Sequence, residues 1–168
     1  KAFSNLGLLM QKNGHFSKAV ENYNIALKIN PEDREILYNK SICLLENGKF
    51  EDGLKLYKWR LNGKYLNSNI FDLDKITNKK ILITCDQGLG DIILTSRFLK
   101  ILANYGAKVT FQIPDSMKEL MKNLDPNISI VSGDIKNDFF DYKCALGDLF
   151  EIFKINKSNV PLTKSYLN

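Results

Sequence analysis

One stretch of this sequence returns on itself with a shift of 34 residues, and that repeat constrains the fold more than any other feature. Residues 13–16, Asn-Gly-His-Phe, return as residues 47–50, Asn-Gly-Lys-Phe, and Tyr23 returns as Tyr57. A fixed period of this length is typical of helical hairpins that stack on one another. Because Asn-Gly is a strong turn signal, each copy is predicted to be two helices joined at that turn. We therefore predict four antiparallel helices within residues 1–61.

The period of 34 residues is that of tetratricopeptide repeats. The first copy has the expected large and small residues at the characteristic positions: Phe3, Leu6, Gly7, Met10, Ala19, Tyr23, Ala26 and Pro31. The second copy is degenerate, because Leu, Gly, Ala and Pro are replaced there by Lys40, Ser41, Arg60 and Tyr65. We assign two repeats to residues 1–62. Three or more repeats are usual in such arrays, so we expect further repeats before Lys1 in the intact protein.

Asn5 and Asn39 also lie 34 residues apart, at a position of the first helix that is expected to face the groove of the repeats. A side-chain amide can both donate a hydrogen bond to a peptide group and accept one from it. The pair resembles the asparagine ladder with which the repeats of O-GlcNAc transferases hold the backbone of an acceptor peptide. This resemblance implies a candidate peptide-binding site, with a protein or peptide as the partner. The alternative interpretation is an ordinary solvated helix face, which two asparagines also fit.

Residues 63–79 are polar and irregular, and we interpret them as a linker between two domains. They contain Asp72-Leu73-Asp74, which resembles the metal-binding Asp-x-Asp of some glycosyltransferases. In those enzymes the motif follows a buried strand, whereas here it precedes the first expected strand. The pattern therefore favours a surface loop over a metal site.

A strand, a glycine turn and a helix are predicted between Lys80 and Gly106. The short branched run Ile81–Ile83 is typical of a buried parallel strand. Gly88 and Gly90 follow it, with Asp91 directly behind. Apolar residues then recur at helical spacing up to the glycine that ends the helix: Leu94, Phe98, Ile101, Leu102 and Tyr105. This succession begins a Rossmann-like unit, in which ligands bind at the carboxyl ends of the strands.

Three interpretations of the glycine turn compete. A dinucleotide-binding turn requires a third glycine where Ile93 stands, so nicotinamide or flavin binding is disfavoured. A phosphate-binding P-loop would end in Gly-Lys-Ser or Gly-Lys-Thr, which the segment does not contain. The third interpretation is a turn that holds the carboxylate of Asp91 at the mouth of the sheet. An aspartate at a helix start is also a common N-cap, worth about 1 kcal/mol, and the pattern alone does not separate these roles.

Strands and helices alternate through the rest of the chain. We predict strands over residues 108–113, 128–131 and 142–146, and helices after Pro114 and over residues 148–155. The helix after Pro114 is expected to turn four residues inward: Met117, Leu120, Met121 and Leu124. Such alternation with short connections predicts a parallel sheet with right-handed crossovers. The predicted fold class is α + α/β, with helical hairpins followed by a Rossmann-like sheet flanked by helices.

An ordered set of motifs resembles bacterial proteins that fuse tetratricopeptide repeats to a glycosyltransferase domain of the GT-B type. The central motif is Asp-Gln-Gly-Leu-Gly-Asp at residues 86–91, with Arg97 and Phe98 behind it. Trp-Arg-Leu at residues 59–61 resembles the segment before the catalytic part of that family, and Phe-Phe-Asp-Tyr-Lys-Cys at residues 139–144 resembles one of its strands. Pro161 with Tyr166 resembles the close of the motif set. One departure is Asp86, where the family usually has Glu.

The resemblance implies that residues 80–168 are the N-terminal Rossmann-like half of a GT-B enzyme. Similar folds occur in heptosyltransferases and in O-GlcNAc transferases, and the position matching the proposed catalytic base of the former is Asp91. It further implies an inverting, metal-independent transfer from a nucleotide-sugar to an acceptor hydroxyl, without another cofactor. The donor would bind a C-terminal half that these residues do not include, so this chain alone is expected to be inactive. Five residues are candidate substrate contacts: Gln87, Gly88, Leu89, Gly90 and Arg97. The alternative is a protein-interaction module whose glycosyltransferase-like half is an inactive scaffold.

Charge and cysteine content narrow the possible partners, metal sites and locations of the protein. The net charge of +5 is spread along the chain without a basic stripe interleaved with aromatics, so no nucleic-acid partner is expected. Cys43, Cys85 and Cys144 are isolated, which disfavours a disulfide framework or a zinc site and indicates a reducing, cytoplasmic location. No apolar stretch reaches the length of a membrane span. The single histidine, His15, lies in a repeat turn and is not expected to take part in catalysis.

Overall fold

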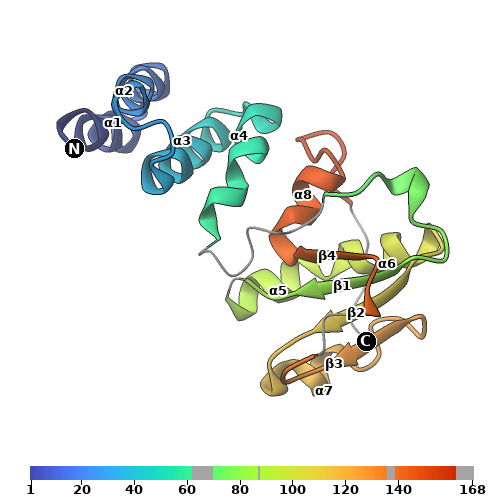
Figure 1. Ribbon diagram of the computed structural model, residues 1–168. Coiled ribbons are helices and arrows are strands. Elements are labelled where there is room, and N and C mark those ends of the chain that lie inside the picture. The colour runs from blue at the N-terminus through green and yellow to red at the C-terminus, as the bar shows by residue number, and fades with distance from the viewer. Residues whose placement is uncertain (62–69, 87, 136–138, 162–168) are drawn as a thin grey trace. The chain divides into compact units, whose positions relative to one another are not determined.

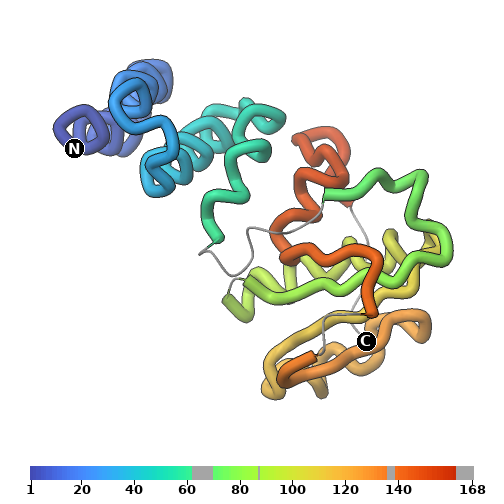
Figure 2. Tube along the Cα trace, viewed as in Figure 1, coloured from blue at the N-terminus to red at the C-terminus, as the bar shows by residue number. Residues whose placement is uncertain are grey.

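The computed structural model describes residues 1–61, 70–86, 88–135 and 139–161. The chain divides into two compact units. The first contains the described residues up to Leu61 together with Lys154–Ser158. The second contains the described residues from Ile70 to Phe153 and from Asn159 to Pro161. In Figures 1 and 2, residues 1–61 of the first unit are blue to teal, and residues 70–153 of the second unit run from green to red-orange.

The first unit consists of the predicted helices, two to each hairpin. Their bounds are α1 Ala2–Lys12, α2 Phe16–Ile29, α3 Arg34–Glu46 and α4 Phe50–Tyr57, with the 3-10 turn η1 at Lys58–Arg60. Helix α1 packs on α2, α3 on α4, and α2 on α3. Gly14 and Gly48 adopt φ angles of 75° and 76° in the two Asn-Gly turns, a region that glycine enters without strain. The repeat in the sequence is therefore a repeat in backbone conformation.

Small residues let the helices of this unit approach closely. The core of the first hairpin gathers Ala19, Tyr23 and Ala26 of α2 with Ile36 and Cys43 of α3. A Cβ atom at Gly7 would lie 2.7 Å from Cε1 of Tyr23, which is closer than real Cβ atoms come to any neighbour. Gly7 is thus required by the packing of the Tyr23 ring. Pro31 lies in the turn after α2, and the side chain of Asp33 caps α3 by accepting a hydrogen bond from the amide of Ile36 at 3.2 Å.

The second unit is built on a sheet of four parallel strands in the order β3-β2-β1-β4. The strands are β1 Lys80–Thr84, β2 Lys108–Gln112, β3 Ile128–Val131 and β4 Tyr142–Ala145. In Figure 1, β4 lies beside β1, and β2 and β3 follow on the other side of β1. All four predicted strands are present. The chain thus leaves β1 toward β2 and β3, and then crosses back to place β4 on the opposite edge of β1.

The helices of this unit are shorter than the sequence pattern predicts. The segment after β1 forms two helices, α5 Leu89–Thr95 and α6 Arg97–Asn104, in place of one continuous helix. At the break, the hydroxyl of Ser96 donates to the carbonyl of Ile93 at 3.0 Å, a local bond that competes with the helix ladder. Because the two helices do not share one face, Leu94 is exposed while Phe98 and Leu102 are buried. Tyr105, which shares the helical spacing of these residues, is also exposed.

The remaining helical segments are single turns. They are η4 Asp115–Met117, α7 Lys118–Met121, η6 Leu146–Asp148 and α8 Leu149–Ile152. Met117, Met121 and Leu124 are buried as predicted, but Leu120 is exposed, so its predicted inward orientation is wrong. The pattern assumed a regular helix from residue 115 onward, whereas the segment starts as a 3-10 turn and shifts the phase of the side chains.

The second half of the segment that we interpret as a linker packs within the sheet unit. Phe71 and Ile76 are buried, and the Phe71 ring lies 5.2 Å from the ring of Tyr142 on β4. The single 3-10 turn η3, Leu73–Lys75, contains two residues of the Asp-x-Asp motif, and the ammonium of Lys75 lies 3.5 Å from the carboxylate of Asp72. No group of three or more His, Cys, Asp or Glu side chains that could hold a metal ion occurs among the described residues.

Candidate functional site

Helices α1 and α3 share one face of the repeat unit, and hydrogen bonds across it hold the hairpins in register. The side-chain amide of Gln11 on α1 donates to the carboxylate of Glu46 on α3 at 2.8 Å. The Tyr23 hydroxyl donates to the same Gln11 side chain, also at 2.8 Å. Burial, together with nearby Cys43 and Glu46, raises the pKa of Tyr23 to about 12, so the phenol keeps its proton. This link is long-range, and no local motif of the sequence indicates it.

Asn5 and Asn39 occupy equivalent positions on these two helices. Asn5 is exposed on α1, and Asn39 is half-buried on α3. Within the part of the chain that the structure describes, neither side-chain amide has a hydrogen-bond partner. Their donors and acceptors are therefore available to a ligand, whereas the amide of Gln11 is used in the link to Glu46.

Arg34, at the start of α3, donates hydrogen bonds to backbone carbonyls at the end of the repeat unit. Its Nε donates to the carbonyls of Trp59 and Leu61, both at 3.0 Å, and its Nη2 donates to the carbonyl of Arg60 at 2.9 Å. Backbone carbonyls at the end of a helix have no partner inside the helix, and the guanidinium supplies one from the start of α3. Sequence reasoning did not identify this residue, because an exposed arginine 25 to 27 positions away carries no local signal.

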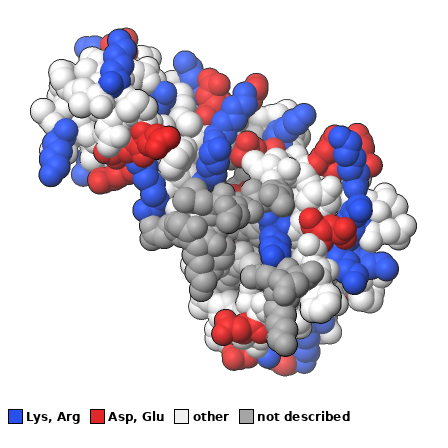
Figure 3. Space-filling model, in the orientation of Figure 1, with Lys and Arg blue, Asp and Glu red and all other residues white. Residues whose placement is uncertain are grey.

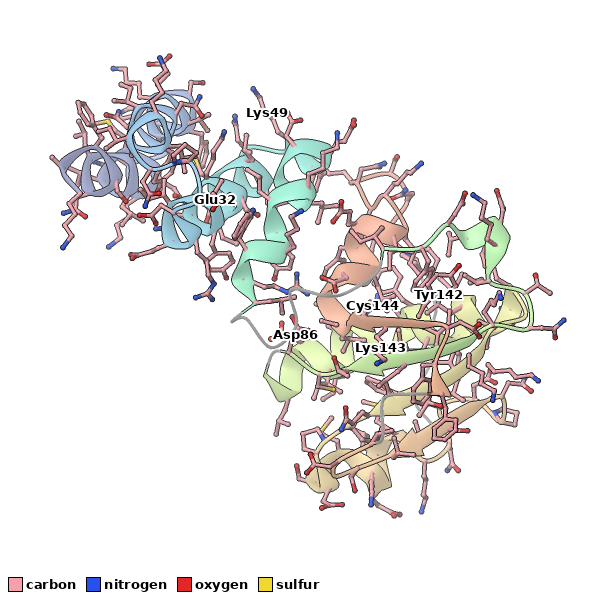
Figure 4. All side chains as sticks on the ribbon, in the orientation of Figure 1. Glu32, Lys49, Asp86, Tyr142, Lys143 and Cys144 are labelled. Carbon is pink, nitrogen blue, oxygen red and sulfur yellow. The ribbon has the colours of Figure 1, made fainter. Side chains whose placement is uncertain are left out.

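In the sheet unit, the loops after β1 and β4 meet at the carboxyl ends of these neighbouring strands. Asp86 follows β1, and its carboxylate accepts a hydrogen bond from the amide of Gly147, after β4, at 3.2 Å. Figure 4 shows Asp86 beyond the end of β1, with Cys144 on the adjacent strand β4. Asp148 is buried and accepts a hydrogen bond from the amide of Ala145 at 2.9 Å. Two carboxylates therefore fix the backbone on either side of the place where the strand order reverses.

Asp91 lies in the first turn of α5, but it does not cap the helix. The N-cap residue is Gly88, and Asp91 is the third residue of the helix, so the interpretation of Asp91 as an N-cap is wrong. The helix begins earlier because the Gly-Leu-Gly turn itself takes helical conformation from Leu89 onward. Asp91 is exposed and stands in the first turn, where the partial positive charge of the helix end favours a carboxylate.

The two glycines before Asp91 are not required by the fold. Gly88 has a φ of −70°, which any residue adopts, and Gly90 does not have a positive φ. Among the residues that the structure describes, a Cβ atom at Gly88 would meet the Asp91 carboxylate, at 3.6 Å, and one at Gly90 would have no neighbour within 4 Å. Leu89, between them, is exposed. In the described part of the chain, the backbone of Gly88 and Gly90 therefore has room beside it, next to the exposed carboxylate of Asp91.

The other predicted contacts of this turn are placed differently. Arg97, at the start of α6, donates from Nε to the carbonyl of Leu94 at 2.7 Å and from Nη1 to the carbonyl of Pro161 at 3.2 Å. Its guanidinium thus binds backbone of the same unit. Gln87 lies outside the described residues, as does Tyr166 at the end of the motif set.

Cys85 directly follows β1 and precedes Asp86. Burial and the neighbouring Asp86 raise the pKa of the Cys85 thiol to about 12, and the thiol donates to the carbonyl of Gln112 at 3.2 Å. A thiol held protonated in this way is a poor nucleophile at neutral pH. Charged side chains of both signs are interspersed on the visible surface of the described residues (Figure 3). Among those residues, no helix has the length and apolar content needed to cross a membrane.

The helical hairpin at the start of the chain belongs to a known class. Residues 1–33 match the model of the tetratricopeptide repeat family, so a tetratricopeptide repeat is present there. A stretch of 59 residues is 41% identical to the photosystem I assembly protein Ycf3 of Parasynechococcus marenigrum (strain WH8102). That match covers 33% of this chain, and the chain spans only 34% of the length of that curated relative. No solved structure matches the chain.

Proposed function

We propose that this chain is a protein-interaction module whose repeat unit binds an extended segment of a partner protein. The observation that carries the proposal is the pair Asn5 and Asn39, which occupy equivalent positions on α1 and α3 with both amides unengaged among the described residues. A peptide backbone presents alternating donors and acceptors, and each amide satisfies one of either kind. The tetratricopeptide repeat over residues 1–33 supports the same class of partner.

The similarity to Ycf3 supports a protein partner and nothing finer. That relative is named as an assembly protein of photosystem I, and an assembly role requires contact with other proteins. Because the match covers a third of this chain, we take from it the class of ligand alone. The hydrogen bond from Gln11 to Glu46 joins the two helices that carry the asparagines, which supports a defined spacing between the two amides.

Selection of peptides displayed on phage, followed by calorimetry, tests this proposal. Each asparagine is expected to make one or two hydrogen bonds worth about 1 kcal/mol each, so the double variant Asn5→Ala/Asn39→Ala should bind the selected peptide about 30- to 1,000-fold more weakly. Asn24→Ala is the matched control, because Asn24 is an exposed asparagine on α2. Peptides that bind the double variant and the parent chain equally would show that the asparagines are a solvated face.

A second candidate function rests on the sheet unit. We propose that Asp91 is the general base of a sugar transfer, because it is exposed beside two glycines that neither backbone strain nor packing requires. The order β3-β2-β1-β4 supports the proposal, because it matches the first four strands of the doubly wound order 3-2-1-4-5-6, whose ligands bind where the strand order reverses. A carboxylate there would take the proton of an acceptor hydroxyl as the hydroxyl oxygen attacks the anomeric carbon of a nucleotide-sugar, whose bond to the nucleoside diphosphate breaks. Gly88, Leu89 and Gly90 would contact the substrate through bare backbone.

The test is the release of nucleoside diphosphate from a panel of nucleotide-sugars by the intact protein that contains this chain. Asp91→Asn keeps the size of the side chain and removes the base, so turnover should fall by about 10² or more. Because Asp91 does not cap α5, both Asp91→Asn and Asp91→Ala should keep the melting temperature close to that of the parent. Full turnover in a folded Asp91→Asn protein would exclude the catalytic role and leave the interaction module as the function.

A further inference from the structure

Helices α5 and α6 follow one another after β1, but they are held in the sheet unit to different extents (Figure 1). On α5, the side chains of Ile92 and Thr95 are buried. On α6, the buried side chains are large and apolar: Phe98, Leu99 and Leu102. Helix α5 packs against the turn η6 after β4, whereas α6 packs against β2 and β3. The helix that carries Asp91 therefore has the weaker attachment to the sheet unit.

The backbone between the two helices is wound more tightly than an α-helix. Ser96 has a φ of −58° and a ψ of −21°, which are values of a 3-10 helix. Its carbonyl accepts a hydrogen bond from the amide of Leu99, three residues further on, at 3.0 Å. A 3-10 step inside a helical segment often marks a hinge.

Three consecutive side chains at this step donate hydrogen bonds to carbonyls of α5. The hydroxyls of Thr95 and Ser96 donate to the carbonyls four and three residues earlier, and both residues are buried away from water. Arg97 donates from Nε to the carbonyl of Leu94 at 2.7 Å. Carbonyls in the last turn of a helix have no amide partner inside that helix. Because these side chains supply donors, α5 can change its angle to α6 without leaving the three carbonyls unpaired.

We propose that α5 pivots as a unit about residues 95–97 and carries Asp91 toward and away from the carboxyl end of β1. The fixed side of the pivot is α6, whose first residue, Arg97, also donates from Nη1 to the carbonyl of Pro161 at 3.2 Å. On the moving side, a Cβ atom at Gly90 would have no described neighbour within 4 Å, so packing leaves room for the motion. The role of the motion rests on the proposed sugar transfer, in which it opens the site and then brings the carboxylate to the acceptor hydroxyl.

Hydrogen exchange of the intact protein that contains this chain, read by mass spectrometry in peptides from α5 and α6, tests the pivot. The amides of α5 should exchange about tenfold faster than those of α6, because α5 opens locally while α6 stays packed. Ser96→Ala and Ser96→Gly are the matched pair, since both remove the hydroxyl. Alanine favours one continuous helix and should slow the exchange of α5 about two- to threefold, whereas glycine should speed it by about the same factor. The exchange of α6 should stay unchanged in both variants.

Equal exchange rates in α5 and α6 would overturn the pivot, because the two helices would then open together. A change of both variants in the same direction would also overturn it, since the hydroxyl rather than the backbone at residue 96 would then set the rate.

The role of the motion is tested separately, by the release of nucleoside diphosphate from nucleotide-sugars. Ser96→Ala should lower turnover by about the factor by which it slows the exchange of α5. Full turnover in a Ser96→Ala protein whose α5 is protected would overturn this role. A parent protein without turnover excludes the sugar transfer, and the exchange of α5 still decides whether the pivot exists.

Discussion

Glycine has opposite roles in the two units of this protein. In the repeat unit, a Cβ atom at Gly7 would lie 2.7 Å from the ring of Tyr23, and one at Gly53 would lie 2.8 Å from the side chain of Leu45. In the described part of the sheet unit, a Cβ atom at Gly88 would meet a carboxylate at 3.6 Å, and one at Gly90 would meet nothing within 4 Å. The comparison teaches that a glycine in a repeat helix is explained by helix packing, whereas the turn after β1 has glycines that the fold itself does not explain.

The two units also differ in how their cores are filled. The repeat core combines one large ring, Tyr23, with small residues that let the helices approach. The sheet unit stacks aromatic rings: Phe98 lies 5.3 Å from Phe153 and 5.6 Å from Phe150 between ring centroids. The largest truncation effect is therefore expected in the sheet unit.

Phe98→Ala should lower the free energy of unfolding of the sheet unit by about 3–5 kcal/mol, because it removes a fully buried ring and two aromatic contacts. Hydrogen exchange of the β1 amides under native conditions measures the loss. Trp59, the single tryptophan, lies in the repeat unit, so its fluorescence during denaturation reports on that unit separately. Unchanged exchange in β1 would contradict the assignment of Phe98 to the core.

Gly7→Ala and Gly90→Ala should change stability in opposite directions. Alanine at residue 7 overpacks the Tyr23 ring and should cost about 1–3 kcal/mol, more than the helix propensity that alanine adds. Alanine at residue 90 enters open space in α5 and should stabilise by about 0.5 kcal/mol through the unfolded state. Urea denaturation of both variants measures the pair. If both substitutions changed the free energy of unfolding in the same direction, the contrast between the glycines of the two units would be wrong.

Tyr23→Phe should destabilise the repeat unit by about 1 kcal/mol at neutral pH, because it removes the hydrogen bond to Gln11. The folded pKa of about 12 is above the ordinary value of 10.0, so the contribution of the protonated phenol is present below pH 10 and is lost as the pH rises toward 12. The difference in the free energy of unfolding between the parent and Tyr23→Phe should therefore disappear as the pH rises from 10 to about 12. Denaturation followed by Trp59 fluorescence at several alkaline pH values measures the gap, and a constant gap would contradict the buried phenol.

The smallest expected changes in stability come from substitutions of surface carboxylates. The amide of Lys80 donates to Asp141 at 2.8 Å, and this bond, with the ammonium of Lys79, holds the pKa of Asp141 below its usual 3.8. Its contribution is thus present above pH 3.8 and is lost as the pH falls through the lowered value. Asp141→Asn should melt below the parent at neutral pH, and the difference should close in acid. Glu51→Gln is the local comparison: Glu51 binds Lys55 one turn away at the surface, and its loss should change the melting temperature less.

The sequence carried different amounts of information for the two units. All four repeat helices follow from the 34-residue period, because each repeat of such an array contacts only its neighbouring repeats and local signals decide the helix ends. The four strands also follow, since Ile81–Ile83 and its counterparts are short branched runs. The helix faces of the sheet unit were less predictable. A single Ser96 splits the helix after β1, and the periodicity of Leu94 with Phe98 does not reveal that break.

Only those features of the candidate site that follow from the type of a single residue could be predicted from the sequence. Asp91 was expected at the start of a helix at the carboxyl end of β1, and it lies in the first turn of α5, but its predicted capping role was wrong. The carbonyl contacts of Arg34 and the bond from Gly147 to Asp86 join residues 25 or more positions apart. Such contacts depend on the finished fold, so spacing along the chain does not indicate them. The catalytic and peptide-binding roles stay predictions.

The position of β4 on the far edge of β1 has a consequence for how the chain is made. Lys80 at the start of β1 binds Asp141 before β4, a partner 61 positions further along the chain. A pairing over that distance closes a long loop, and loop closure of this kind slows folding relative to the local contacts of a hairpin. During synthesis, the helical hairpins can form soon after they leave the ribosome, whereas β1 waits for the last strand of the sheet. In that interval one edge of β1 has open hydrogen-bonding groups, which makes this strand the segment that a nascent chain most needs to protect.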